Sequence, residues 1–176
     1  MRVAVITGLS GVGKTSVARA IGARLQCRWA GVGDFLRARA KEELGRETAA
    51  EFADALRTSV GTLGLFEAFV NWVGVAQDSD LIVEGVRTVE GLESLQILLR
   101  PTSLQIVELV APTSVRQERL RKREASEGRS YEQTVEHCIG LPSNHPLSPS
   151  LVVIDATPAV DQVAAAVAQS LTWSND

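Results

Sequence analysis

Eight residues near the start of the chain, from Gly8 to Thr15, read G-L-S-G-V-G-K-T. They complete the pattern G-x-x-x-x-G-K-[ST], in which glycines let successive backbone N–H groups turn toward the phosphates of a nucleotide. In such loops the lysine reaches the β- and γ-phosphate oxygens, and the final hydroxyl ligates Mg²⁺. The sequence therefore predicts a site for ATP or GTP with Mg²⁺. The residues expected to contact the nucleotide or its metal are Gly8, Ser10, Gly11, Val12, Gly13, Lys14, Thr15 and Ser16.

The elements around this loop support the same interpretation. The loop pattern is meaningful only where a strand precedes it and a helix follows. An apolar run over residues 3–7 comes before it, and apolar residues recur at helical spacing over residues 16–25 after it. The glycines stand at positions 8, 11 and 13, so the G-x-G-x-x-G pattern of dinucleotide-binding loops does not fit. A glycine-rich turn without a ligand is the alternative that this context disfavours.

Two acidic residues each follow a predicted strand. Asp34 comes after a weak apolar run and opens a helical pattern, and Glu84 ends the run Leu81-Ile82-Val83. Residues at the carboxyl ends of parallel strands face the ligand site of such sheets. We expect Glu84 to hold water on Mg²⁺, and Asp34 to face the acceptor. The alternatives are a helix N-cap for Asp34 and a solvated strand-end charge for Glu84.

Arginines follow both acidic positions and recur further along the chain. Arg37 lies one helical turn after Asp34, a spacing that suits either acceptor binding or an ion pair with Asp34. Arg87 would point toward the same edge of the sheet and hold an anionic acceptor. Arg116, Arg119 and Arg123 share one helical face, where they would stabilise charge on a transferring phosphoryl group. A solvated basic helix, paired with its own glutamates, is the alternative for this stripe.

Apolar runs alternate with helical patterns along the chain, which is typical of a parallel sheet covered by helices on both faces. We therefore predict an α/β protein of three layers, α/β/α, with a five-stranded parallel sheet. The expected strands cover residues 3–7, 28–32, 81–84, 104–110 and 151–155. The expected helices cover about residues 14–26, 34–44, 48–58, 62–77, 88–99, 113–126 and 159–171.

Length and composition indicate one domain over residues 1–176, with a helical insertion at 34–77 and a lid region at 113–149. The net charge of −3 argues against a general nucleic-acid binder. No apolar stretch reaches the 18 residues of a membrane span, and Cys27 and Cys138 show no metal-binding spacing. We expect a cytoplasmic protein with reduced thiols that acts as a monomer or homodimer. His137 and His145 are expected to be ordinary loop or helix residues.

As a set, these residues resemble the nucleotide-kinase branch of the P-loop proteins. Residues 33–37, Gly-Asp-Phe-Leu-Arg, resemble the acceptor-binding segment G-D-x-L-R of adenylate kinases, whose arginine holds the acceptor's phosphate. Residues 119–123 resemble the R-x-x-x-R at the lid entrance of those enzymes, which implies that Arg119 packs on adenine and Arg123 contacts phosphates. The loop of related kinases that passes beside the adenine corresponds to the segment containing Thr157.

The chain is also similar to a group of archaeal dephospho-CoA-kinase-like nucleotide kinases. Their third strand ends D-G-I-R, matched by Glu84-Gly85-Val86-Arg87, and their L-R-x-x-x-G matches residues 56–61, which implies acceptor binding by Arg57. The likeness covers about residues 1–126. The chain departs from adenylate kinases in lacking both a proline before Arg87 and the arginines of a long lid. It also lacks the archaeal D-x-R-E segment after the lid helix.

These resemblances and residues predict an ATP-dependent kinase of a small phosphorylated acceptor, in the first place a nucleoside monophosphate. A phosphate acceptor is already largely ionised at neutral pH and needs positioning by Arg37, Arg57 and Arg87. The first alternative is transfer to a hydroxyl, as in dephospho-CoA kinase, with Asp34 as the base. The second is a nucleotide-gated regulatory ATPase without a small acceptor.

Overall fold

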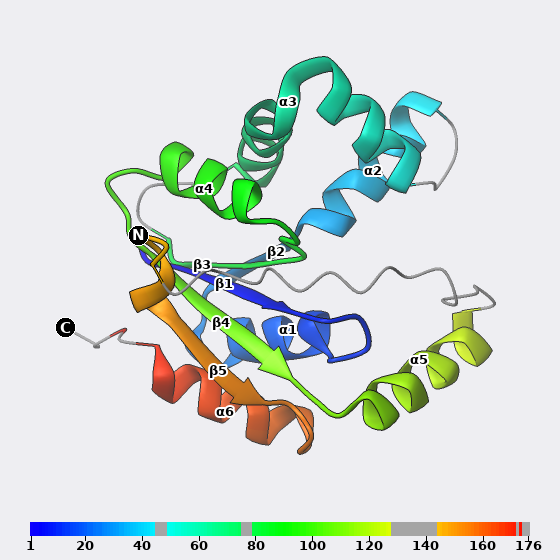
Figure 1. The fold of residues 1–176 in the computed structure, drawn as a ribbon, viewed down its shortest axis with the longest axis vertical. Helices are drawn as coiled ribbons and strands as arrows, with labels where there is room; N and C mark the ends of the chain where they lie inside the picture. Colours follow the sequence, from blue (N-terminus) through cyan, green and yellow to red (C-terminus); the bar gives the residue numbers. More distant parts are fainter. Residues whose placement is uncertain (45–48, 75–78, 128–143, 172, 174–176) are drawn as a thin grey trace.

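The computed structural model describes residues 1–44, 49–74, 79–127, 144–171 and 173. Six α-helices alternate with five strands in this part of the chain, in the arrangement of Figure 1. The strands are β1 (Val3–Gly8), β2 (Arg28–Gly31), β3 (Leu81–Glu84), β4 (Leu104–Val110) and β5 (Leu151–Asp155). The helices are α1 (Lys14–Leu25), α2 (Val32–Leu44), α3 (Ala49–Val73), α4 (Val89–Leu98), α5 (Thr113–Glu127) and α6 (Val160–Ser170).

The five strands form one parallel sheet in the order β2-β3-β1-β4-β5. Strand β1 lies at the centre between β3 and β4, and its residues are buried, as expected for a strand covered on both faces. In the register of the sheet Ile6 pairs with Glu84, and Glu84 pairs with Gly31. The carboxyl ends of β1, β3 and β2 therefore meet at one edge, where the loop after β1 also begins.

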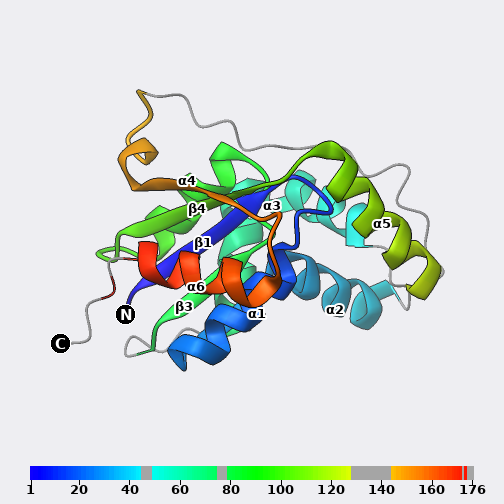
Figure 2. The same ribbon diagram turned by 90° about the horizontal axis from the view of Figure 1, so that it is seen from below.

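Helices cover both faces of the sheet, as Figures 1 and 2 show. On one face α2, α3 and α4 pack over a core that includes Phe35, Phe69 and Leu95. On the other face α1 and α6 enclose a second core that includes Ile21 and Val167. Helix α5 lies beyond the carboxyl edge of the sheet, beside the loop after β1 (Figure 1). The predicted three-layer α/β/α fold is confirmed.

Element boundaries differ from the predictions at two places that matter for the site. Helix α2 begins at Val32, so the predicted last residue of the second strand belongs to the helix instead. The predicted helices at 48–58 and 62–77 are joined as α3 around a break at Gly61, whose φ of 72° and ψ of 178° are not helical. That backbone conformation is restricted to glycine, which explains why the direction of α3 changes there. Within the predicted lid region, the structure describes residues 113–127 and 144–149. His137 and Cys138 are not among the described residues.

Within the described ranges, no helix is both long enough and apolar enough to cross a bilayer.

Candidate active site

The loop between β1 and α1 is built on three glycines with positive φ. Gly8, Gly11 and Gly13 have φ values of 129°, 79° and 101°. A Cβ atom on Gly8 would lie 2.3 Å from the carbonyl oxygen of Leu109, so even alanine would force the loop away from β4. The glycines therefore allow a tight turn that leads directly into the first turn of α1 at Lys14.

The side chain of Lys14 folds back over the loop that precedes α1. Its Nζ donates hydrogen bonds to the backbone oxygens of Gly8, at 2.8 Å, and Leu9, at 3.1 Å. Burial lowers the pKa of Lys14 to about 8, and the positive charges of Arg87, Arg116 and Arg123 also lower it, whereas Glu84 raises it. Arg87 and Arg123 are both exposed, and they lie close enough to the loop for their charges to act on Lys14. A polyanion bound here would favour the charged ammonium.

Thr15 and Glu84 form a contact between the start of α1 and the end of β3. The Thr15 hydroxyl donates a hydrogen bond to Glu84 Oε1 at 3.1 Å. Glu84 is 6% exposed, and burial raises the pKa of its carboxyl above the usual range, opposed by the Thr15 hydrogen bond and by Lys14. Mg²⁺ at such sites takes one or two carboxylates together with phosphate oxygens and water. A hydroxyl and a carboxylate in contact beside the loop fit that donor set, directly or through water.

Asp34 lies in the first turn of α2, next to Glu84. A Cβ atom on Gly31 would lie 2.6 Å from Glu84 Oε1 and 3.0 Å from Asp34 Oδ2, so both carboxylates approach the same backbone position. The negative charge of Asp34 also contributes to the raised pKa of Glu84. The N-cap alternative for Asp34 is wrong, because the helix already begins at Val32. Arg37 forms an ion pair with Asp34 one turn away, as its spacing suggested.

The three arginines predicted to share one face of α5 occupy different environments. Arg116 is 4% exposed and donates to the backbone oxygen of Ser10 at 3.2 Å. Its own backbone oxygen would lie 2.6 Å from a Cβ on Gly11, so the first turn of α5 packs directly on the phosphate loop. Arg123 is exposed further along the helix. Buried Arg116 therefore holds the helix against the loop, whereas a role for Arg123 in phosphoryl transfer stays a prediction.

Arg119 connects the phosphate loop to the segment after β5. Its guanidinium donates to the backbone oxygen of Val12 at 3.0 Å, and to those of Ala156 and Thr157 at 2.9 and 3.2 Å. Asp155 shapes this segment, because its carboxylate accepts from both the N–H and the hydroxyl of Thr157, which lowers the pKa of Asp155. The predicted nucleotide contacts Arg119 and Thr157 are thus brought together beside the loop.

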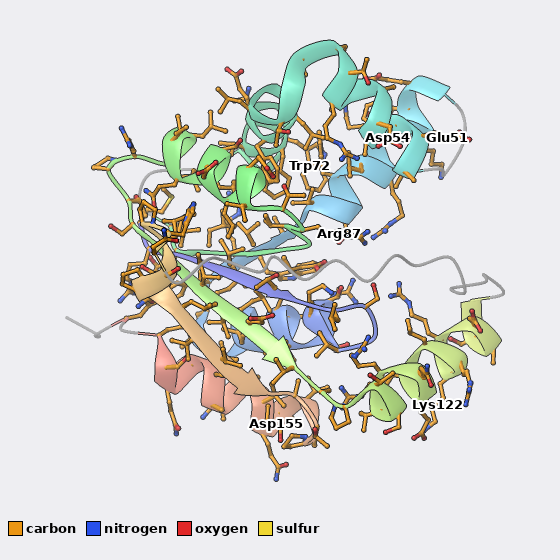
Figure 3. The ribbon with its side chains drawn as sticks, viewed as in Figure 1. Glu51, Asp54, Trp72, Arg87, Lys122 and Asp155 are labelled. Atoms are coloured by element: carbon orange, nitrogen blue, oxygen red, sulfur yellow. The ribbon has the colours of Figure 1, made fainter. Side chains whose placement is uncertain are left out.

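Arg57 is the candidate that the structure connects least to the others. It lies on the first half of α3, where it forms an ion pair with Asp54 at 2.6 Å and donates to the Ala53 oxygen. Figure 3 shows Asp54 and Glu51 on α3 above the sheet, whereas Arg87 lies lower, between α3 and the loop region. Of the predicted acceptor-binding residues, Asp34, Arg37 and Glu84 are joined by contacts or charge effects.

Two features of the site were missed at the level of sequence. Gly31, where the two carboxylates meet, carries no motif that singles it out, although the spacing Gly31-x-Gly33 before Asp34 was visible. A pocket beside Asp34, lined partly by Trp72, was also missed, because an isolated tryptophan in a helical pattern gives no sign of what it faces.

The parallel sheet in the order 2-3-1-4-5, with a phosphate loop between its central strand and the next helix, defines a P-loop protein of the kinase architecture. The AAA domain family matches residues 5–140, and the chain belongs to this family. No curated protein sequence matches the chain significantly.

Several solved structures of similar fold match nearly the whole chain. A protein from Chloroflexus aurantiacus J-10-fl is 20% identical to this chain, with a TM-score of 0.64. The match covers 97% of this chain and 95% of that protein. A gluconokinase from Sinorhizobium meliloti 1021 is 18% identical, with a TM-score of 0.58, and the match covers 99% of this chain and 98% of the gluconokinase. The shikimate kinase of Aquifex aeolicus VF5 is 13% identical, with a TM-score of 0.55, and the match covers 96% of this chain and 95% of the shikimate kinase. These likenesses show the fold.

Proposed function

We propose that the protein is an ATP- and Mg²⁺-dependent phosphotransferase that acts on a hydroxyl of a small acceptor. The observation that carries this proposal is the meeting of two carboxylates, Glu84 and Asp34, at Gly31, with Glu84 bonded to Thr15 of the phosphate loop. One carboxylate can serve the metal of the nucleotide while the other faces the acceptor. Two solved structures of the same fold, a gluconokinase and a shikimate kinase, carry names that specify hydroxylated acceptors.

On the nucleotide side, the loop's backbone N–H groups and Lys14 would bind the phosphates. Thr15 and Glu84 would hold Mg²⁺, which supplies charge neutralisation at the β- and γ-phosphate oxygens. Arg119 holds the loop and the segment at Thr157 in one arrangement, so it would position the nucleotide between them. Arg123, whose charge acts on Lys14, would stabilise negative charge that develops during transfer.

On the acceptor side, Asp34 would take the proton of the attacking hydroxyl. The hydroxyl oxygen forms a bond to the γ-phosphorus as the bond to the β,γ-bridging oxygen breaks, the proton passes to the Asp34 carboxylate, and ADP leaves. Arg37 forms an ion pair with Asp34 and orients that carboxylate. A hydroxyl acceptor requires such a base, because a neutral alcohol is a poor nucleophile.

Transfer to a nucleoside monophosphate is the second candidate. It is favoured by two exposed or half-exposed arginines, Arg37 and Arg87, on the acceptor side of the phosphate loop. A phosphate acceptor needs cations rather than a base, because it is already ionised. In this case Asp34 would only orient Arg37.

The substitution Asp34→Asn separates the two candidates. ADP release would be measured with Mg·ATP and a panel of sugar acids, nucleosides, dephospho-CoA and nucleoside monophosphates. For a hydroxyl acceptor, Asp34→Asn is expected to lower kcat at least about 100-fold with little change in KM, the usual range for loss of a general base. A main effect on KM would favour the monophosphate, and ATP hydrolysis that none of these compounds stimulates would contradict both candidates.

A further inference from the structure

A pocket of about 350 Å³ opens beside the proposed site, along the outer edge of the sheet. It is lined by residues Arg28–Gly31 of β2, Asp34 of α2, and Trp72 and Val73 of α3. Pockets of roughly 300 Å³ and above are the size range in which proteins bind small molecules. Because Asp34 and Gly31 line it, the pocket begins at the position where the two carboxylates meet.

Trp72 gives this pocket an aromatic wall. The indole ring packs against Phe35, at 5.7 Å between ring centroids, and stacks on Phe69 at 6.5 Å. The tryptophan nevertheless remains 44% exposed. Figure 3 shows it on α3 above Arg87. A ring held rigidly by two phenylalanines and open to the pocket is suited to stacking against a flat ligand, since little side-chain freedom is lost on binding.

The opposite wall is the outer edge of β2, which pairs with no further strand among the residues that the structure describes. In a parallel pair, alternate residues direct both backbone groups toward the neighbouring strand. The N–H of Arg28 pairs with Asp80 on the β3 side, so the backbone groups of Trp29 face the outer edge. The indole of Trp29 turns away to the α1 side, where Arg19 lies 4.8 Å from its centroid. The strand therefore offers the pocket backbone donors and acceptors, which suit the edge of a nitrogen-containing ring.

Gly31 connects the pocket to the reacting groups. It belongs to the pocket lining, and it has no side chain where Glu84 and Asp34 approach it. A ligand in the pocket would thus reach the Asp34 carboxylate from one side while the nucleotide approaches Thr15 and Glu84 from the other. Arg28, at the other end of the strand, is held by the backbone oxygens of Val73 and Gly74, so it closes that end as a fixed cation.

We propose that this pocket binds the non-reacting end of the acceptor, and that this end is a planar nitrogen-containing ring stacked on Trp72, with the acceptor hydroxyl placed at Asp34. A nucleoside has this chemistry. The identification of this ligand as the acceptor rests on the proposed function. The existence of a ring-binding pocket can be tested separately, because binding does not require transfer.

The test is calorimetric titration with adenosine of protein saturated with the magnesium complex of a non-hydrolysable ATP analogue, which keeps adenosine out of the nucleotide site. The variants are Trp72→Leu, which removes the ring, and Trp72→Phe, which keeps one. Leu63→Ala is the control, because Leu63 is 45% exposed on the same helix and does not line the pocket. Adenosine should bind the wild type, Trp72→Phe and Leu63→Ala with affinities within about threefold. Trp72→Leu should weaken binding at least tenfold at unchanged affinity for the ATP analogue.

The outcomes separate this inference from the proposed function. Adenosine binding that depends on Trp72, without ADP formation in its presence, would support the pocket and contradict phosphotransfer to this ligand. Phosphotransfer to a ringless sugar acid with a KM unaffected by Trp72→Leu would support the enzyme and overturn the pocket's role. The inference is also overturned if adenosine does not bind the saturated wild type, or binds Trp72→Leu equally well.

Discussion

The hydroxyl of Thr15 and the carboxylate of Glu84 are 3.1 Å apart, although they are separated by 69 positions in the sequence. Parallel pairing of β1 with β3 explains this contact, because Ile6 and Glu84 are partners in register and the loop after β1 returns to the same edge. The two groups that the sequence suggested as metal ligands are therefore neighbours.

Loss of the Glu84 carboxylate should uncouple nucleotide binding from Mg²⁺. In the wild type, Mg²⁺ is expected to tighten ATP binding, because Thr15 and Glu84 add protein ligands to the nucleotide's own oxygens. Glu84→Gln should reduce this enhancement at least about tenfold, the typical effect of removing a partner of a metal site. Titrations with and without Mg²⁺ would measure it. Thr58→Ala is the control, because the Thr58 hydroxyl bonds only within α3, to the Asp54 oxygen, in the contacts described. An equal effect in both variants would contradict the assignment.

Affinity for Mg·ATP should fall as the pH rises above 8. The pKa of Lys14 in the free protein is lowered to about 8 by burial, and phosphates bind the charged form. Above that pH, binding must first return a proton to Lys14, so the association constant should drop by up to about tenfold per pH unit. Calorimetry from pH 7 to pH 9.5 would show the decline. Lys14→Arg, whose guanidinium stays charged throughout, should remove the pH dependence, and a flat wild-type profile would contradict this explanation.

Gly31→Ala should disturb both carboxylates without unfolding the protein. The added Cβ would lie 2.6 Å from Glu84 Oε1 and 3.0 Å from Asp34 Oδ2, closer than ordinary contacts, so the two side chains must move. We expect kcat for phosphotransfer to fall at least about tenfold, because small displacements of catalytic groups are costly. Gly33→Ala is a matched control, since its nearest neighbour is an Arg37 nitrogen at 3.4 Å. Similar kcat values for the two variants would argue against a role for the carboxylate pair.

Arg116→Leu should destabilise the protein, whereas Arg121→Leu on the same helix should not. Arg116 is buried and donates to the backbone oxygen of Ser10. Loss of this charged donor should lower the free energy of unfolding by about 1.5–3 kcal/mol. Arg121 is exposed, so its replacement should change stability by less than about 0.5 kcal/mol. Urea unfolding monitored by circular dichroism would measure both. Equal midpoints for the two variants would show that Arg116 does not hold α5 on the loop.

Much of the fold was predictable from local patterns. Strands β1 and β3 were visible as short apolar runs, because strands buried on both faces have no polar alternation, and the phosphate loop marked the first turn of α1. The break in α3 was also indicated, since Gly61 interrupts the helical pattern. The start of α2 was misplaced by two residues, because a weak strand that leads straight into a helix has no separating turn.

The site was predictable in its residue types but not in its contacts. Helical spacing placed Arg116, Arg119 and Arg123 on one face, but periodicity does not say which neighbour that face packs against. Only the docking of α5 at Gly11 distinguishes buried Arg116 from exposed Arg123. The meeting of Asp34 and Glu84 at Gly31 depends on the strand order, which places β2 beside β3 and which no local pattern specifies.

The loop from Gly8 to Thr15 is expected to bind the phosphates of ATP. Calorimetric titration of the wild type with Mg·ATP, with the variant Lys14→Ala measured in parallel, would show whether it does. We expect one-to-one association by the wild type that Lys14→Ala weakens at least about 100-fold, because the Lys14 ammonium bonds to the loop oxygens of Gly8 and Leu9. No heat of association with the wild type, or equal affinity in Lys14→Ala, would contradict it.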